Sequence, residues 1–188
     1  FIAEKYSDCT AKRVIAVGRL DYQKSFDRLI QVWEKVHQQM PDWRLDIFGQ
    51  GEWKEMLQKM IDARGMQDVV KLNNPTNNIG DEYVDSSIIV MTSNYEGFGM
   101  VLVEAMSCGV PAVSFDCKCG PEEIISQHDG GLVVKNGDIE GLAEAIVKLM
   151  KDEELRKRMG ENAKRVVETY SEERVMGLWE DLYEEILR

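Results

Sequence analysis

Short apolar runs alternate with longer amphipathic segments along most of this chain. The apolar runs have the length of buried strands, and we predict strands over residues 13–18, 43–48, 69–72, 88–91, 112–115 and 132–135. Between them, apolar residues recur every three or four positions, as Leu29, Trp33 and Val36 do. This spacing predicts helices over residues 26–39, 52–64, 79–85 and 122–127, and in the apolar segment that ends at Gly109.

From residue 138 onward the chain has only the helical pattern. We predict helices over residues 138–151, 152–170 and 171–188, with Ser171 as the N-cap of the last one. Residues 1–12 are polar and are predicted to be a linker. Strands that alternate with helices at this spacing predict an α/β fold, with about six parallel strands and helices on both faces of the sheet. We find no internal repeat, and we interpret residues 1–188 as a single domain.

The stretch from residue 88 to residue 111 is organised as a strand, a tight turn and a helix. After the strand comes a polar corner at residues 92–95, then Glu96, and then Gly97 and Gly99 on either side of Phe98. Glycines leave backbone N–H groups uncovered, and a helix N-terminus carries positive potential. The turn therefore favours a bound anionic group.

Glu104 is unusual because it lies inside the apolar helix that follows this turn. A carboxylate among apolar neighbours is costly unless a hydrogen bond compensates it, and a sugar diol would supply two hydroxyl donors. The alternative is structural, with Glu104 capping a neighbouring backbone. Glu96 lies at the mouth of the same turn, and two carboxylates bracketing a helix start favour the ligand interpretation.

Other loops with suitable chemistry also follow predicted strands, where ligands of open parallel sheets bind. Gly18, Arg19 and Lys24 follow the first strand, and the two cations could hold a diphosphate, although surface charge after a strand is the structural alternative. The loops at residues 49–51 and 73–79 could contact a nucleotide base or could be simple turns.

Composition and absent motifs exclude several classes. The net charge of −11 makes nucleic acid an unfavourable partner, and no apolar run approaches the roughly 20 residues of a transmembrane helix. The chain has no G-x-G-x-x-G, no P-loop and no D-x-D triplet, which disfavours a dinucleotide oxidoreductase, a P-loop NTPase and a metal clamp for diphosphate. We interpret Phe1 as a cut inside a longer chain.

The cysteines and histidines form no recognisable metal motif. We interpret Cys117 and Cys119 as loop thiols of a cytosolic protein, in preference to a redox or metal pair. His37 and His128 are both predicted to be surface residues.

The central stretch resembles a known enzyme family. Glu96-Gly97-Phe98-Gly99-Met100, Glu104-Ala105-Met106 and Gly109-Val110-Pro111 are similar to the E-x7-E signature of the family-4 retaining glycosyltransferases, which have the GT-B fold. Two further segments, residues 120–124 and 130–133, resemble the family's later motifs, so the resemblance covers nearly the whole chain. The loop at residues 73–78 departs from the family's aromatic-glycine pattern, which leaves the base undetermined.

The resemblance implies a role for each matching residue. The catalytic residues would be Arg19 and Lys24 on the donor diphosphate and Glu96 near the donor sugar hydroxyls. Glu104 would bind the ribose hydroxyls, and the rest of the donor site would be Gly18, Gly97, Phe98, Gly99 and Met100. No nucleophile is assigned, and the resemblance implies no metal and no cofactor other than the nucleotide-diphosphate sugar, with UDP favoured over GDP.

The resemblance also implies what surrounds the site. The chain would be the Rossmann-like, C-terminal, donor-binding half of a GT-B enzyme whose N-terminal acceptor domain is absent. The enzyme would transfer a hexose with retention of configuration to a glycan or lipid-linked acceptor. We expect a cytoplasmic location, with any membrane contact made through the missing half at the inner face.

Two alternatives remain open. A sugar-nucleotide epimerase can share this fold, but it would be expected to have a different set of catalytic carboxylates and histidines. A non-catalytic nucleotide-binding or protein-interaction module is the other alternative. Assaying transfer by the full-length chain separates this module from the glycosyltransferase.

Overall fold

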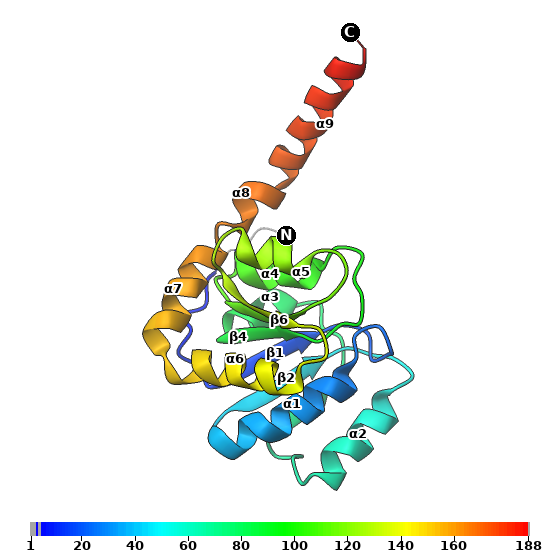
Figure 1. Cartoon of the computed structure of the whole chain (residues 1–188), viewed down its shortest axis with the longest axis vertical. Coiled ribbons are helices and arrows are strands. Elements are labelled where there is room, and N and C mark those ends of the chain that lie inside the picture. The colour runs from blue at the N-terminus through cyan, green and yellow to red at the C-terminus, as the bar shows by residue number, and fades with distance from the viewer. Residues whose placement is uncertain (1–2, 4, 188) are drawn as a thin grey trace.

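Parallel strands form one sheet at the centre of the structure, a computed structural model that describes residue 3 and residues 5–187 (Figure 1). Within those residues the sheet has 6 strands in the order β3-β2-β1-β4-β5-β6, and every pairing is parallel. The strands are β1 (Arg13–Val17), β2 (Arg44–Phe48), β3 (Val70–Asn73), β4 (Ile88–Met91), β5 (Ala112–Asp116) and β6 (Gly131–Lys135). The predicted parallel α/β sheet is confirmed, and its strands lie within one or two residues of the predicted ranges.

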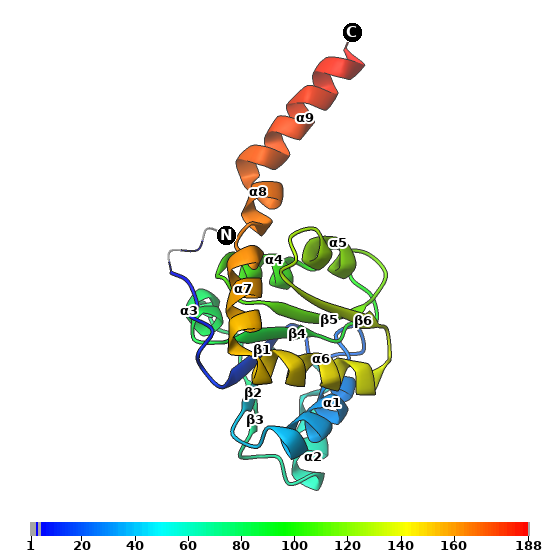
Figure 2. The same cartoon turned by 60° about the vertical axis from the view of Figure 1, so that its left-hand side comes forward.

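Helices cover both faces of this sheet, because its central strands present apolar side chains on both sides (Figure 2). Along β1, Val14 and Ala16 belong to one core cluster, and Ile15, between them, belongs to the other. The first cluster includes α1 (Phe26–Gln39), α2 (Lys54–Ala63) and α6 (Ile139–Lys151). The second includes α3 (Ile79–Val84), α4 (Met100–Ser107) and α5 (Pro121–Ser126).

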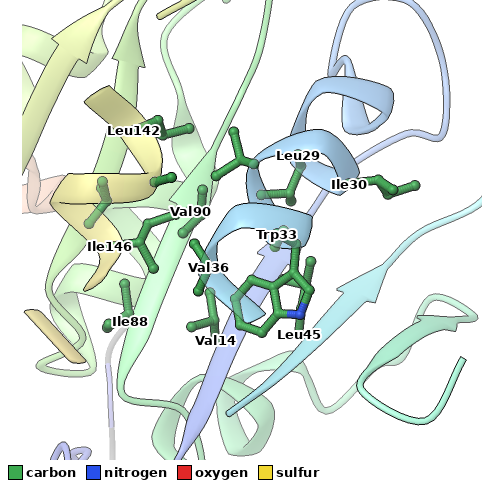
Figure 3. Packing of buried hydrophobic residues seen from close by; sticks show 14 of the residues in the cluster. Val14, Leu29, Ile30, Trp33, Val36, Leu45, Ile88, Val90, Leu142 and Ile146 are labelled. Atoms are coloured by element: carbon green, nitrogen blue, oxygen red, sulfur yellow. The ribbon is translucent and has the colours of Figure 1, made fainter. Parts of the chain in front are cut away.

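The larger core lies between α1, α6 and the sheet. Trp33 points from α1 toward the strands and lies beside Val14 and Leu45 (Figure 3). Its side chain is fully buried. This packing fixes α1 on the sheet, and with it the loop that joins β1 to α1.

The helix predicted over residues 152–170 is wrong as a single element. The structure has α7 (Glu153–Ala163) and a separate α8 (Val166–Tyr170). At the break, the amide of Arg165 donates to Asn162 and that of Glu168 to Arg165, a tightening to three-residue spacing. The break allows Val166 to be buried in the cluster that contains α4. No proline or glycine marks this position, so the helical pattern continued through it.

The last helix, α9 (Glu172–Ile186), extends away from the rest of the chain in both views (Figures 1 and 2). Ser171 caps it as predicted, accepting a hydrogen bond from the amide of Arg174 at 3.3 Å. None of the described residues of α9 is buried. None of the helices in the described part of the chain combines the length and apolarity needed to cross a bilayer. Residues 1, 2 and 4 of the predicted linker and residue 188 of the predicted last helix lie outside the described residues.

Candidate functional site

The strand order reverses between β1 and β4. From β1 the chain proceeds outward through β2 and β3, and then returns to β4 on the other side of β1. Connections leaving two such strands diverge, which opens a crevice beyond their carboxyl ends where ligands of this architecture bind. The segment after β1 contains Gly18, Arg19 and Lys24, and the segment after β4 contains Glu96 and the glycine turn.

Hydrogen bonds join these two segments. The backbone amide of Asn94 donates to the carbonyl of Gln23 at 2.8 Å. The hydroxyl of Thr92 lies 3.1 Å from the carbonyl oxygen of Lys24 and 3.2 Å from that of Ser25. Ser25 has a left-handed backbone with φ of 52°, which is unusual for a residue other than glycine. The two segments therefore form one connected surface.

Lys24 and Glu96 form an ion pair across this junction. The Lys24 ammonium lies 2.6 Å from Glu96 Oε1, and the side chains are 13% and 6% exposed. The hydroxyl of Ser93 donates to the same oxygen at 2.5 Å. Glu96 Oε2 accepts no hydrogen bond from any residue that the structure describes. The carboxylate is thus held on one side and retains a free oxygen.

Gly18 determines where Lys24 lies. A Cβ added at Gly18 would come within 2.8–2.9 Å of three carbons of the Lys24 side chain. The aliphatic part of Lys24 therefore passes directly over the glycine on its way to Glu96. A larger residue at this position would force the Lys24 side chain to shift.

Arg19 is more exposed than Lys24. Its side chain is 69% exposed, its Nε lies 3.2 Å from Asp21, and its guanidinium donates to Gln23 at 2.6 Å. Gln23 in turn donates to the backbone carbonyl of Tyr95 at 3.3 Å. Gln23 thus connects Arg19 to the turn after β4. Among the described residues, Arg19 makes no hydrogen bond or ion pair with Glu96.

The glycine turn leads directly into α4. Gly99 is the N-cap residue with φ of 101°, a conformation that favours glycine. No hydrogen bond among the described residues uses the backbone amides of Gly97 and Phe98. Together with the unpaired amides of the first helical turn, they provide positive potential for an anion. Met100, the first residue of α4, is 54% exposed at the same position.

Two other parts of the chain, Gly120 and Tyr170, pack against the glycine turn. Gly120 has φ of 106°, and a Cβ there would lie 1.8 Å from the carbonyl oxygen of Phe98. The ring of Phe98 packs edge-on against Tyr170 of α8, with ring centroids 5.1 Å apart. A loop after β5 and the helix after α7 therefore both position the turn.

Glu104 lies in the second turn of α4 and is partly buried. The hydroxyl of Tyr83, on α3, donates to Glu104 Oε2 at 3.0 Å. In the described part of the chain, no backbone amide donates to the Glu104 carboxylate, so the backbone cap of the structural alternative is not found there. A buried tyrosine satisfies one of its oxygens.

The family described as "Glycosyl transferases group 1" matches residues 3–166, which includes the sheet and every site residue that the sequence predicted. The chain belongs to the group 1 glycosyltransferases.

Several relatives and solved structures are similar to this chain. The chain is 40% identical over 170 residues to the amylovoran biosynthesis glycosyltransferase AmsD of Erwinia amylovora, covering 90% of this chain and 47% of that protein. It is 37% identical to an exopolysaccharide phosphotransferase of Streptomyces coelicolor, covering 96% of this chain and 19% of that protein. A structure of a TarM mutant from S. aureus, in complex with fondaparinux, alpha-GlcNAc-glycerol and UDP, superposes with a TM-score of 0.89 and 29% identity. That match covers 97% of this chain and 37% of TarM, so the chain spans half or less of the length of these proteins.

Two further loops of this glycosyltransferase chain follow β2 and β3. The β2 loop packs closely on the β1 loop, since the amide of Leu20 donates to Gln50 at 2.9 Å and that of Trp53 to Leu20 at 2.9 Å. In the β3 loop, Asn74 accepts a hydrogen bond from Lys54 at 2.8 Å. The β2 loop thus has a structural role, and contact of either loop with a base stays a prediction.

The prediction that His128 is a surface residue is wrong. His128 is 9% exposed, and its Nε2 lies 3.1 Å from the hydroxyl of Thr169 on α8. It lies against α8, which follows the break that the sequence did not reveal and contributes Val166 to the second core cluster. His37 is partly exposed, as expected for a surface residue.

The cysteines are all free. Cys9, Cys108 and Cys117 are buried, whereas Cys119 is exposed. Burial is the main cause that raises the pKa of Cys117 to about 11, and the negative charge of Glu96 raises it further. Across the described residues, no group of three or more His, Cys, Asp or Glu side chains could hold a metal ion.

The sequence interpretation missed the residues that hold the predicted carboxylates. Ser93 appeared only as part of a polar corner, and Tyr83 only as part of a short helix. A buried carboxylate such as Glu104 must have a donor, but the sequence could not reveal which residue supplies it. Tyr83 and Glu104 are 21 positions apart and meet only because α3 and α4 pack on the same face of the sheet.

Proposed function

We propose that this chain is the C-terminal, donor-binding half of a family-4 retaining glycosyltransferase. The observation that carries the proposal is the meeting of Lys24 with Glu96 beside the N-terminus of α4, at the crevice where the strand order reverses. The cation and the unpaired amides suit the diphosphate of a nucleotide-diphosphate sugar, and the carboxylate with a free oxygen suits its sugar hydroxyls.

In this proposal the diphosphate binds Arg19, Lys24 and the amides of the glycine turn. Arg19 is solvent-exposed, so its guanidinium can turn from Asp21 toward a diphosphate at little desolvation cost. Lys24 is already held at the turn by Glu96. Cations and oriented amides stabilise the charge that develops on a departing diphosphate.

Glu96 and Glu104 bind the two sugars of the donor. The free Oε2 of Glu96 accepts a hydroxyl of the transferred hexose, and Glu104 accepts the ribose hydroxyls. Gly18, Phe98 and Met100 shape the site around them. UDP is proposed as the nucleotide in preference to GDP, and the UDP in the TarM complex supports this choice.

We propose transfer with retention of anomeric configuration and without a metal ion. The cations Arg19 and Lys24 take the part that a divalent metal plays at a diphosphate. No nucleophile is assigned to the chain, and Glu96 is not proposed as one.

The proposal also includes an N-terminal domain and a place for α9. The chain spans about half of AmsD, and α9 presents Val175, Leu178, Trp179 and Leu182 to solvent. We propose that an N-terminal domain of the full-length protein covers this face and binds a glycan or lipid-linked acceptor. Placement in the cytoplasm, at most peripheral to the inner face of the membrane, rests on the family resemblance alone.

Transfer by the full-length protein tests this proposal. With a UDP-hexose and an acceptor, NMR of the product should show the anomeric configuration of the donor, and EDTA should leave the rate unchanged. The 188-residue chain alone should bind the donor weakly and transfer nothing. An inverted product, or a rate abolished by EDTA and restored by a divalent cation, contradicts the mechanism proposed here.

A further inference from the structure

Tyr83 connects α3 to the proposed ribose site. Its ring is fully buried, and only its hydroxyl reaches the partly buried Glu104, at 3.0 Å from Oε2. A buried ring can move little, because close packing fixes its rotamer. The hydroxyl therefore presents its proton to Glu104 from a fixed position.

The helix that carries Tyr83 is itself anchored to the sheet. Arg13, a buried residue of β1, lies 2.5 Å from the Glu82 carboxylate and donates to the Glu82 carbonyl at 3.4 Å. Arg13 also pairs with Asp46 of β2 at 2.5 Å. Because Glu82 directly precedes Tyr83, this network fixes the position of the tyrosine relative to the central strands.

The hydroxyl of Tyr83 acts only as a donor toward Glu104. Burial, and then the negative charge of Glu104, raise the pKa of Tyr83 far above its ordinary value. The phenol is thus protonated at neutral pH. Glu104 Oε1 accepts no hydrogen bond from the residues that the structure describes.

We propose that Tyr83 is a positioning residue that holds the carboxylate of Glu104 so that Oε1 receives a ribose hydroxyl. This inference rests on the proposed role of Glu104. A glutamate side chain has several rotatable bonds, and fixing them before the ligand arrives removes an entropy loss from the binding step. Tyr83 contributes to affinity through Glu104 and has no contact with the ligand in this proposal.

Calorimetric titration of the chain with UDP and with 2′,3′-dideoxyuridine diphosphate tests the inference. Tyr83→Phe removes the hydroxyl and keeps the buried ring. We expect it to weaken UDP binding about fivefold, the scale of one net hydrogen bond. It should not change the affinity for the dideoxy nucleotide, which lacks the ribose hydroxyls. In a Glu104→Gln background, Tyr83→Phe should have little further effect on UDP binding.

Ser87→Ala is the matched control, because it removes another buried hydroxyl, one that donates to the carbonyl of Ala11. It should lower stability without changing the preference for UDP over the dideoxy nucleotide. If Tyr83→Phe weakens both nucleotides equally, or neither while Glu104→Gln weakens UDP, the positioning role is wrong. If the unmodified chain binds both nucleotides equally well or does not bind UDP, the proposed ribose role of Glu104 fails first, and the inference fails with it.

Discussion

The ion pair of Lys24 and Glu96 is nearly excluded from water, with side chains 13% and 6% exposed. A charge in such a place is tolerated only while its partner is present. The same lysine thus serves the fold, by neutralising Glu96, and the proposed site, by facing the diphosphate. These two roles can be separated by substitution.

Lys24→Met should destabilise the chain by about 3 kcal/mol, because it leaves Glu96 buried without a counter-charge. The double variant Lys24→Met with Glu96→Gln should recover at least half of that loss, since no charge is then stranded. Both variants should bind UDP more weakly than the unmodified chain does. Urea unfolding measures the stabilities and calorimetry the affinities; a double variant no more stable than the single one would show that the pair is not coupled.

Gly120→Ala should lower the free energy of unfolding by about 1–3 kcal/mol and weaken nucleotide binding. At φ of 106° an alanine is strained, and its Cβ would lie 1.8 Å from the Phe98 carbonyl oxygen. Gly65→Ala is the control, because Gly65 has φ of 65° but nothing within 4 Å of an added Cβ. Urea unfolding of both variants, with UDP titration, checks this. Equal effects of the two substitutions on binding would mean that the loop after β5 does not support the glycine turn.

At the scale of elements, α8 (Val166–Tyr170) forms the link between the body and the tail. His128 contacts Thr169, and Tyr170 contacts Phe98 of the glycine turn. Burial, and then the positive charge of Arg165, lower the pKa of His128 below its ordinary value of 6.5. The unfolded chain therefore binds a proton at a pH at which the folded chain does not.

Stability should accordingly fall as the pH is lowered through about 6.5, before most carboxylates titrate. His128→Gln should flatten this part of the curve, and His37→Gln should leave it unchanged. Thermal unfolding between pH 7.5 and pH 5 is the measurement. If His128→Gln keeps the full pH dependence, the imidazole is not protected from protonation in the fold.

The tryptophans of α1 and α9 give a direct test of how independent α9 is. Trp33 is fully buried and Trp179 is 50% exposed. Trp33→Ala should cost about 3–5 kcal/mol, and Trp179→Ala no more than about 0.5 kcal/mol. Urea unfolding followed by circular dichroism compares them. A large loss on truncating Trp179 would indicate that α9 packs on this domain in solution.

The pattern of apolar residues predicted the elements of the sheet because strand and helix periods are local properties. It could not predict the break at Lys164 and Arg165, which is set by the burial of Val166 against a distant cluster. It also could not show that α9 extends away from the sheet, with no buried residue among those described. Both features depend on tertiary contacts and have no local signal.

At the scale of the whole molecule, the site exists because strands that are distant in sequence are neighbours in the sheet. Arg19, Lys24 and Glu96 could be selected from the sequence, since charged residues in glycine-containing loops after apolar runs are a local pattern. Glu104 could be selected because it interrupts an apolar helix. The pairing of Lys24 with Glu96 and the contact of Tyr83 with Glu104 bridge separate loops and helices, so only the fold reveals them. The proposed function depends on these contacts between distant parts of the same chain.

Calorimetric titration of the chain and of its Glu104→Ala variant with UDP tests the central claim most directly. The unmodified chain should bind UDP, and the variant should bind it more weakly by ~1–3 kcal/mol, the scale of an unmade hydrogen bond to a charged group. Circular dichroism should first show that both proteins are folded. No heat with UDP or GDP on the folded chain, or an unchanged affinity in the variant, would contradict the account.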